Sequence, residues 1–305
     1  MGTDDQTVVQ EVFFVDDVTN SALLAFPVGC VSRTQEIQQP FLHAHDGYEL
    51  YMCLSGRGKM LAGERVHEVA PGSLVVIQPG ALHMPRSVPR EPFHRYIVSI
   101  DKAYLEELAD KESGFGGNAV TRWLPREEPS VCWQLNGRQM LALQDILAQL
   151  ERELDERKEC FSLAAHSLVL QLFVALGRYQ EGQPPGTAGN GERKQLVEEM
   201  MGLVAEGYQE TLRIESLCRR FHLSRSYLHR IFKQETGLSI TEYLIAYRIN
   251  KAKEALDSSS MPLAEVALSS GFQDLSHFCR MFKRLTGVTP GHYRRSGAGL
   301  KGYHA

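Results

Sequence analysis

The sequence predicts a multidomain β-plus-α protein, with an N-terminal β-barrel, following helices, and a C-terminal all-α domain that holds two helix-turn-helix units. Three observations predict this class. Residues 8–100 carry short β-rich runs punctuated by Gly and Pro, which is typical of an all-β barrel or sandwich. From Gln139 onward the apolar residues recur with the period of amphipathic helices. Beyond residue 193 the sequence repeats itself, which indicates a duplicated structural unit.

Composition and charge limit the functional classes. The six cysteines are scattered without a CxxC pair, which indicates reduced thiols rather than disulfides or a zinc site. No apolar run approaches the ~18 residues of a membrane span, and acids stand where a signal peptide is basic, so we expect a cytoplasmic protein without a membrane partner. The net charge is −4, but from Arg193 onward 17 Lys and Arg face 11 Asp and Glu. The basic C-terminal part is therefore the one expected to meet a polyanion.

The segment after the β-rich region is predicted to be a helix pair. Its first helix has leucines at three- and four-residue steps, namely Leu143, Leu147, Leu150 and Leu154. The second, FSLAAHSLVLQLFVALGRY, is apolar on most faces and is predicted to be buried. Pro, Gly, Thr and Asn then crowd together in EGQPPGTAGNGE, which is typical of a linker. The predicted boundaries are 1–135 for the β domain, 136–180 for a helical dimerisation and coupling segment, 181–192 for a flexible linker, 193–295 for the all-α domain and 296–305 for a flexible tail.

The internal repeat is the strongest signal. SYLHRIFKQETGLSITEY (226–243) aligns with SHFCRMFKRLTGVTPGHY (276–293), and polar as well as apolar positions coincide. Each copy is predicted to form a helix, a turn and a second helix, over 212–237 and 262–287. Ser224 and Asp274 are expected to cap the second helices, and Gly237 and Gly287 to end them. The residues expected to pack inward are Ile214, Leu217, Cys218, Phe221, Leu228, Ile231, Phe232, Phe278, Met281 and Phe282.

The face left outside mixes arginine with short polar side chains, which suits the major groove of DNA. Between the two units, SITEYLIAYRINKAKEALDS is predicted to form a helix of about 19 residues and roughly 28 Å. Successive major grooves on one DNA face lie about 34 Å apart, so both second helices can reach neighbouring grooves. A protein-binding helical repeat, or charged faces that are merely solvated, remain alternatives. The residues expected at DNA are Ser224, Arg225, Ser226, His229, Arg230, Lys233, Leu275, Ser276, Cys279, Arg280 and Lys283.

Residues 193–295 resemble the DNA-binding domain of AraC/XylS-type transcriptional regulators. The resemblance rests on FKQETG…EYL…R…KAKEAL and on GFQDLSHFCRMFKRLTGVTPGHYRR. It implies two helix-turn-helix units joined by a long helix, with one arm of a dimer at each DNA half-site. Two positions depart from the family pattern, because His222 stands where glycine is frequent and Leu275 where a polar residue or proline is common. The residues that the resemblance places against bases are Ser226, His229, Arg230, Leu275, Ser276, Cys279 and Arg280.

A second constellation lies in the β domain. HAHDGYELYMCLSG fits the pattern HxHx₃Ex₆G, and GSLVVIQPGALH follows with another histidine. Histidines two apart on a strand face the same side, so His43 and His45 can point inward together with Glu49 and His83. These runs resemble the two motifs of the cupin barrel over residues 25–100, with Gln78 at a position where proline is commoner.

Three hypotheses compete for this histidine set. The four residues form a metal site of a cupin enzyme, a metal-free pocket for a small polar effector, or a structural hydrogen-bond network. The AraC resemblance favours the metal-free pocket and makes a carbohydrate the leading ligand class. We therefore expect no cofactor, and no metal is favoured. Trp123 is a candidate for stacking on a sugar ring. The candidate effector residues are His43, His45, Glu49, His83, Arg33, Tyr51 and Arg95.

The function expected from these patterns is that of an effector-responsive, sequence-specific DNA-binding transcription activator. Its expected partners are double-stranded DNA, a small molecule, RNA polymerase and a second copy of the chain. Since no phosphate loop, GxSxG elbow or HExxH motif occurs, we do not expect an enzyme. The alternative is a metal-dependent cupin enzyme fused to a helical DNA-binding module.

Overall fold

The structure is a computed structural model of the chain, and it describes residues 15–35, 42–112, 121, 123–125, 127–179 and 191–300. The strands are β1 (Val28–Arg33), β2 (Tyr48–Ser55), β3 (Gly58–Ala62), β4 (Arg65–Val69), β5 (Ser73–Ile77), β6 (His83–Ser87), β7 (His94–Ile100) and β8 (Ser130–Gln134). The helices are α1 (Val15–Ala25), α2 (Lys102–Glu112), α3 (Gly137–Glu156), α4 (Phe161–Tyr179), α5 (Glu192–Glu206), α6 (Ile214–Phe221), α7 (Arg225–Thr236), α8 (Ile240–Ser258), α9 (Leu263–Ser269), α10 (Leu275–Thr286) and α11 (Pro290–Leu300).

The strands form two antiparallel sheets. The five-stranded sheet has the order β1-β7-β2-β5-β8, and the three-stranded sheet has the order β4-β3-β6. Among the described residues no ladder joins the two sheets into a closed barrel, so the prediction of a barrel is corrected to a two-sheet β domain. The exception to regular pairing is an isolated bridge between His43 and His83, which ties the segment before β2 to the start of β6.

Alternation along the strands places one core between the sheets. Tyr51 and Cys53 of β2 face this inner core together with Met60 of β3, whereas Leu50 and Met52 of β2 face the opposite way. The inner core is thus lined by both sheets, and the other face of the five-stranded sheet is free for helices. Because successive side chains of a strand point to opposite faces of the sheet, the same strand contributes residues to both cores.

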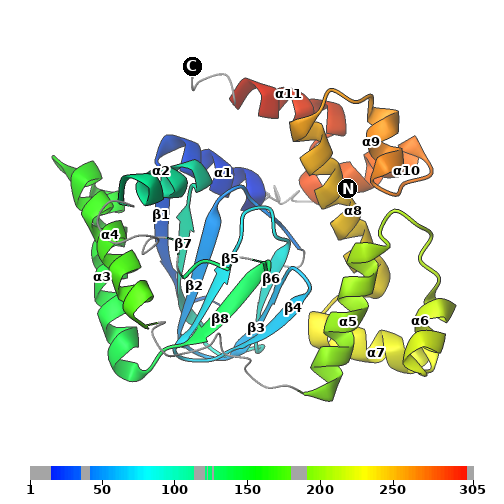
Figure 1. Cartoon of the computed structure of the whole chain (residues 1–305), viewed down its shortest axis with the longest axis horizontal. Helices are drawn as coiled ribbons and strands as arrows, with labels where there is room; N and C mark the ends of the chain where they lie inside the picture. Colours follow the sequence, from blue (N-terminus) through cyan, green and yellow to red (C-terminus); the bar gives the residue numbers. More distant parts are fainter. Residues whose placement is uncertain are drawn as a thin grey trace, which may run out of the picture.

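Helices α3 and α4 cover that outer face, as Figure 1 shows at the left of the molecule. A capping box at Asn136 begins α3, since its side chain accepts from the Gln139 amide while the Gln139 side chain accepts from the Asn136 amide. The predicted leucine face is confirmed at Leu143, Leu147 and Leu150, which are buried against the sheet, while Leu154 is half-buried.

Helix α4 differs from its expected burial. Leu172 and Phe173 are among its buried residues, but Leu163 is 71% and Val174 is 47% exposed. The helix is therefore apolar on an outward face as well as on its packed face. By length and hydropathy alone α4 would also be able to cross a membrane, contrary to the expectation from the sequence; its inward side packs against α3 and the five-stranded sheet.

Two helices interrupt regions for which no helix was predicted. The β-rich stretch beginning at residue 8 contains α1, whose Leu23 lies under Gly47. Helix α2 follows β7 and buries Leu105 and Leu108 in the core that the five-stranded sheet forms with α3 and α4. Residues 181–190 of the predicted linker and residues 301–305 of the predicted tail lie outside the described residues, and α11 extends to Leu300.

The C-terminal part consists of two helix-turn-helix units on one long helix. Helices α6 and α7 form the first, α9 and α10 the second, and the 19 residues of α8 join them. The predicted caps are confirmed, since Ser224 and Asp274 accept from backbone amides and Gly237 and Gly287 end their helices with positive φ. Of the predicted inward residues, the following are buried: Leu217, Leu228, Ile231, Phe232, Phe278, Met281 and Phe282.

The first unit and the β domain share a hydrophobic core. Leu61 and Val66 from the outer face of the three-stranded sheet pack with Leu228 and Phe232 of α7. Figure 1 shows α5, α7 and α8 on the side of the β domain opposite to α3 and α4. The second unit has its own core, which includes Phe278. The sheet therefore packs directly against the first unit, and α8 joins the first unit to the second.

Substitution of Leu61 tests this shared core. Leu61 is fully buried between the sheet and the helices, so Leu61→Ala should lower the free energy of unfolding by about 2–5 kcal/mol. Leu268→Ala is the control, because Leu268 is 68% exposed and its loss should change stability by less than about 0.5 kcal/mol. Guanidinium titration of the full chain measures both. A cost for Leu61→Ala as small as that of the control would show that the two parts do not pack together in solution.

His222 provides a second test, because it ends α6 with φ of 54°, in the left-handed region that favours glycine. His222→Gly should raise the free energy of unfolding by about 0.5–1 kcal/mol. The matched variant is Gly237→Ala at the end of α7, where φ is 80° and a Cβ would lie 2.5 Å from Cζ of Arg86. This variant should be destabilised. Thermal unfolding of both proteins measures the difference, and a loss of stability in His222→Gly would contradict the expectation.

Candidate functional site

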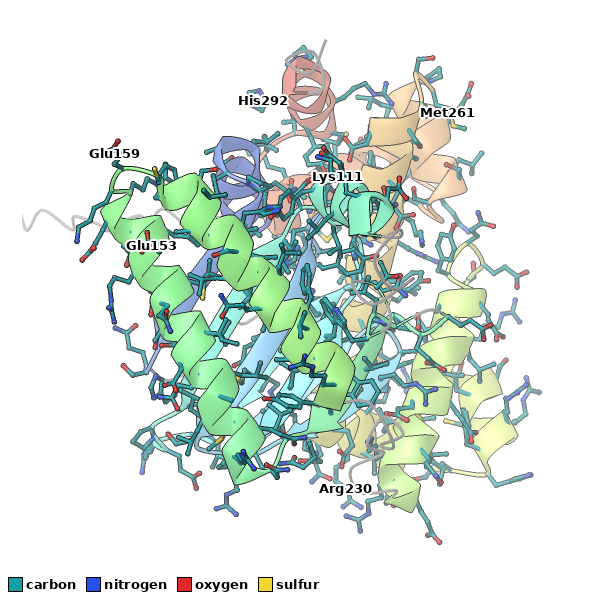
Figure 2. The ribbon with its side chains drawn as sticks, turned by 60° about the vertical axis from the view of Figure 1, so that its left-hand side comes forward. Lys111, Glu153, Glu159, Arg230, Met261 and His292 are labelled. Carbon is teal, nitrogen blue, oxygen red and sulfur yellow. The ribbon has the colours of Figure 1, made fainter. Side chains whose placement is uncertain are left out.

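The predicted recognition helix of the first unit presents a polar outer face. The Ser224 hydroxyl accepts from the Tyr227 amide and so starts α7, which leaves the first turn at the surface. Arg230 is exposed and its guanidinium lies 5.1 Å from the ring of Tyr227. In Figure 2 it lies at the lower edge of the molecule and points outward. The predicted residues of this helix are exposed at Ser224, Arg225, Ser226, Arg230 and Lys233, and half-buried at His229.

The second unit presents the equivalent face on α10. Asp274 accepts from the amides of Ser276 and His277, so this helix also begins with its first turn outward. Leu275, the departure from the family pattern, is 43% exposed at the first position of the helix. The predicted residues are exposed at Leu275, Ser276, Arg280 and Lys283, and half-buried at Cys279. Both units therefore expose arginine and serine at corresponding positions.

Sequence reasoning missed further basic residues on this domain. Arg219 and Arg220 are exposed in the last turn of α6, and Arg284 is exposed beside Lys283. A phosphate backbone accepts such side chains without reading sequence. The signal that identifies them is their position, since they lie one or two residues after the predicted inward residues Cys218 and Phe282.

The histidine cluster is assembled as predicted. One possible ligand atom from each of His43, His45, Glu49 and His83 lies within 4.8 Å of the other three, and all four residues are buried. His43 and His83 are brought together by two backbone hydrogen bonds, 3.1 and 2.8 Å long, and their rings have centroids 3.9 Å apart. Glu49 comes from β2, on the strand face that also carries Tyr51.

Backbone carbonyls fix the tautomers of two of these histidines. Nδ1 of His45 lies 3.0 Å from the carbonyl oxygen of Gly47, and Nδ1 of His83 lies 2.9 Å from that of Ala81. Since a carbonyl can only accept, both Nδ1 atoms carry the proton. Each Nε2 then faces the same carboxylate oxygen, Oε2 of Glu49, at 3.0 Å for His45 and 3.7 Å for His83.

The electrostatics of the cluster favour a neutral imidazole beside an ionised carboxylate. Burial, reinforced by His83, holds the pKa of His43 well below its usual value. Burial by itself would raise the pKa of Glu49, but His83 and His45 hold that pKa well below its usual value. Imidazole nitrogens and a carboxylate oxygen are ligand types of divalent transition metal ions, so the residue types present fit a metal ion.

The other predicted effector residues divide into two groups. Tyr51 and Arg95 lie buried on the inner side of the five-stranded sheet, where burial raises the pKa of Tyr51 and Arg95 lowers it in part. Arg95 donates to the carbonyls of Gln35 and Phe93. Arg33 lies opposite Arg95 in the pairing of β1 with β7, but it is exposed at the end of β1, so the structure does not bring it into the histidine cluster.

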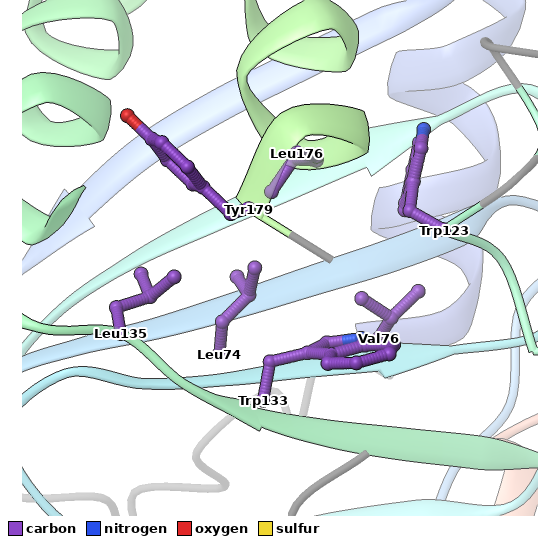
Figure 3. A pocket seen from close by; sticks show the side chains of 7 residues that line it. All are labelled: Leu74, Val76, Trp123, Trp133, Leu135, Leu176 and Tyr179. Atoms are coloured by element: carbon purple, nitrogen blue, oxygen red, sulfur yellow. The ribbon is translucent and has the colours of Figure 1, made fainter. Parts of the chain in front are cut away.

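A separate apolar pocket lies between the five-stranded sheet and the end of α4 (Figure 3). It encloses about 300 Å³, including the part open to solvent, and none of the predicted effector residues line it. Trp123, the candidate for stacking on a sugar, lines it instead. Its lining residues are Leu74, Val76, Trp123, Trp133, Leu135, Leu176 and Tyr179.

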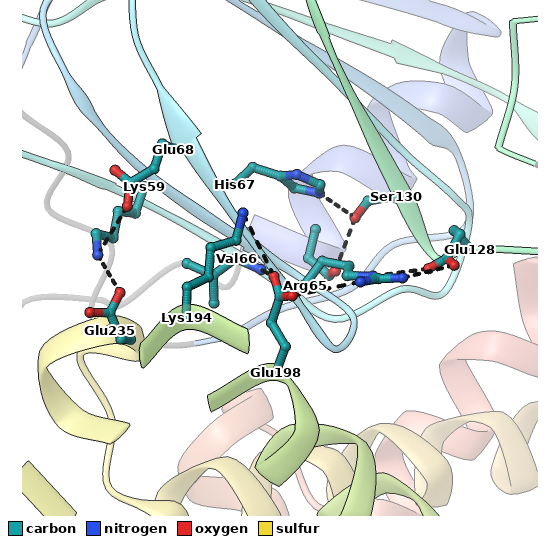
Figure 4. A network of polar contacts seen from close by, with 11 residues as sticks. Lys59, Arg65, Val66, His67, Glu68, Glu128, Ser130, Lys194, Glu198 and Glu235 are labelled. Atoms are coloured by element: carbon teal, nitrogen blue, oxygen red, sulfur yellow. Dashed lines mark hydrogen bonds and ion pairs between the residues drawn. The ribbon is translucent and has the colours of Figure 1, made fainter. Parts of the chain in front are cut away.

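A polar network joins the β domain to the first helix-turn-helix unit (Figure 4). Lys59 of β3 forms ion pairs with Glu68 and with Glu235 of α7. Glu198 of α5 accepts from the Val66 amide at 2.9 Å. The network was not predicted, because each of its ion pairs across the boundary joins residues far apart in the sequence.

The same network extends to the edge of the sheet. Arg65 lies 3.6 Å from Glu198 and forms a two-pronged pair with Glu128. Burial, with Lys194 and Arg65 adding to it, lowers the pKa of His67 to about 4, so His67 is neutral at pH 7.

Comparison with known proteins agrees with this two-part arrangement. The family model of the AraC-like ligand binding domain matches residues 27–173, and that of a helix-turn-helix domain matches residues 217–296. The HTH-type transcriptional activator RhaR of Cronobacter sakazakii is 28% identical over 264 residues, which cover 85% of this chain and 88% of that protein. RhaR of Salmonella dublin is 26% identical over 254 residues, covering 83% and 86%.

Among solved structures, ToxT from Vibrio cholerae is 15% identical, covers 90% of this chain and 99% of its own, and has a TM-score of 0.34. The two family models together span about three quarters of the chain and place a ligand-binding domain ahead of a helix-turn-helix domain. The chain belongs to the AraC family of transcriptional regulators.

Proposed function

We propose that this regulator activates transcription from promoters that it binds through the outer faces of α7 and α10, in response to a small cytoplasmic molecule. The observation that carries the proposal is the equivalent exposure of Arg230 and Arg280 on the two capped helices. Arginine reads guanine edges with two hydrogen bonds, and serine lets a helix approach the bases closely. The curated relatives named above are activators, which supports the same sign of regulation here.

The family excludes the alternative derived from the sequence. The chain is a transcription regulator and not a metal-dependent enzyme. The DNA-binding surface that we propose consists of Ser224, Arg225, Ser226, His229, Arg230, Lys233, Leu275, Ser276, Cys279, Arg280 and Lys283. RNA polymerase is the further partner expected of an activator bound at a promoter.

We place the effector site on the cupin-like inner side of the β domain. His43, His45, Glu49 and His83 converge there, and Tyr51 and Arg95 extend the polar lining. Nε of Arg95 and the hydroxyl of Tyr51 are buried and have no hydrogen-bond partner among the described residues. Both groups are therefore available to a ligand. A carbohydrate, with many hydroxyl groups, is the ligand class that these donors and acceptors suit. Arg33 is the cross-strand neighbour of Arg95 but is exposed, and it is left out for that reason.

We propose that residues 1–135 form the effector-sensing domain and residues 193–295 the DNA-binding domain. We further propose that α3 and α4, within residues 136–180, form the dimerisation segment. Leu163 and Val174 are exposed three helical turns apart on one face of α4, and Leu141 of α3 is 60% exposed. Burying these side chains against the same surface of a second copy removes apolar area from water. A dimer presents four recognition helices to two half-sites.

Single alanine substitutions test the DNA surface. Arg230→Ala and Arg280→Ala should each weaken binding by about 1–3 kcal/mol, the value of one lost two-pronged base contact. The measurement is fluorescence anisotropy with duplexes selected from a random pool by the unaltered protein. Arg138→Ala is the matched control, because Arg138 is exposed on α3 and away from the proposed surface. Unchanged affinity in both recognition-helix variants would refute this surface.

Sedimentation equilibrium tests the dimer. The unaltered chain should sediment at twice its mass of 34.3 kDa, and the double variant Leu163→Lys with Val174→Lys should sediment as a monomer, since charges would have to be buried. Leu268→Lys, at an exposed leucine of α9, should remain dimeric. A double variant that stays dimeric would place the interface elsewhere.

A further inference from the structure

Two turns that belong to different helix-turn-helix units lie against each other. The turn that leads from α5 into α6 carries Tyr208 and Gln209, and the turn between α9 and α10 carries Gly271. A Cβ on Gly271 would lie 2.5 Å from the carbonyl oxygen of Tyr208 and 3.0 Å from Cα of Gln209, so the two backbones are in direct contact. This contact joins the units at a second place, apart from their connection along α8.

Arg248 of α8 connects the long helix to this contact. Its Nε donates to the carbonyl of Tyr208 and its Nη2 to the carbonyl of Glu210, each over 2.7 Å. The same guanidinium lies 5.8 Å from the ring of Phe272 in the turn of the second unit, a distance at which an aromatic face attracts a cation. One side chain from the middle of α8 therefore contacts both turns.

The geometry of these contacts requires arginine. Burial lowers the pKa of Arg248, and among the described residues its two hydrogen bonds go to backbone carbonyls. Arginine presents its N–H groups in a fixed planar fork, whereas lysine carries its donors on a single nitrogen. Arg248→Lys would therefore keep the charge but lose the planar bridge between two carbonyls.

Two glutamines extend the contact at the surface. Nε2 of Gln209 donates to the carbonyl of Ser269 over 2.9 Å, and Nε2 of Gln273 donates to the hydroxyl of Thr211 over 3.3 Å. Both glutamines are exposed, and each reaches from the turn of one unit to the other unit. Arg248, Gln209 and Gln273 thus form a polar clasp between the two units.

We propose that the clasp fixes the orientation of α10 relative to α7, and thereby the number of base pairs between the two groove segments that one chain binds. Arg248 is a positioning residue in this role, because it acts through the two turns and lies outside the proposed DNA surface. The effect on base-pair spacing rests on the proposed function, whereas the contact between the turns does not depend on it.

The shape of DNA makes this orientation important. Two units joined along one helix are restrained in their distance along it, but their rotation about its axis depends on contacts away from that axis. One added base pair rotates the next groove segment by about 34° and moves it by about 3.4 Å. The clasp lies off the axis of α8 and opposes such a rotation. It therefore restricts the domain to one spacing of the two segments.

A series of duplexes with altered spacing tests this role. The starting duplex is one selected from a random pool by the unaltered full-length protein, and footprinting locates the two groove segments of each half-site. One base pair is then inserted or removed between them, and affinity is measured by fluorescence anisotropy at constant salt. Each change should weaken binding by the unaltered protein about tenfold or more, because one recognition helix loses its base contacts.

Arg248→Met should flatten this dependence on spacing. The same insertions and deletions should cost it no more than about threefold, because its units can rotate to follow the DNA. Arg248→Lys should behave in the same way, since charge alone does not bridge two carbonyls. If Arg248→Met does not fold, the double variant Gln209→Ala with Gln273→Ala replaces it, because both of these side chains are exposed.

Lys251→Met is the matched control on the same helix. Lys251 forms an ion pair with Glu254 of α8 at 2.9 Å, and its substitution removes one positive charge, as Arg248→Met does. A lost charge weakens binding to all duplexes by the same factor. The ratio of affinities between spacings should therefore stay that of the unaltered protein.

Hydrogen exchange tests the contact without DNA. In Arg248→Met, amides in the turns 207–213 and 270–274 should exchange several-fold faster than in the unaltered protein. Helix α3, which packs in the core on the far side of the five-stranded sheet, serves as the internal reference.

The outcomes distinguish the clasp from the proposed function. A spacing dependence as steep in Arg248→Met as in the unaltered protein would overturn the role in spacing. Unchanged exchange in both turns would overturn the clasp itself. Faster exchange in both turns of a protein that binds no duplex would support the clasp and overturn the proposed function.

Discussion

The arrangement of the molecule depends on one hydrophobic contact, the packing of the three-stranded sheet against the first helix-turn-helix unit. Leu61 and Val66 on the sheet and Phe232 on α7 lie in the same core, so the outer face of the three-stranded sheet and the inward face of α7 are buried together. Ion pairs such as that of Lys59 with Glu235 lie at the edge of this contact. The buried apolar area supplies most of the free energy of this contact between the sheet and the helices. The ion pairs at its edge are partly exposed to solvent and therefore contribute little.

This contact gives the β domain two different outer surfaces. One surface is covered by α3 and α4, and α4 exposes Leu163 and Val174 on its outward side. The opposite surface meets the DNA-binding helices through the same two segments, the one before β2 and the start of β6, that carry His43 and His83 on their inner side. The inner side of the sheets therefore lies one strand thickness from the helices that pack on the outer side.

Local patterns allowed the helical domain and the histidine set to be predicted. Ser224, Gly237 and Asp274 act on neighbouring backbone groups, and the repeat doubled the information about which positions pack inward. Contacts between distant segments escaped prediction, including that of Asn250 with Gly80 and the position of α1 under Gly47. The alternation of Leu42 and Ala44 with the histidines is visible in the sequence. That these two side chains pack against the first helix-turn-helix unit could not be predicted, because contacts between domains produce no periodic pattern in the sequence.

The long helix α8 belongs to both cores of the DNA-binding domain. Its first half packs with the shared core through Tyr243, and its second half carries the core of the second unit through Ile249 and Leu256. The sheet thus holds the first half of α8, and the second unit is attached to the other half. A tilt of about 10° at that end moves the far end of a ~28 Å helix by about 5 Å, so a small change at the sheet becomes a large displacement of α10 relative to α7.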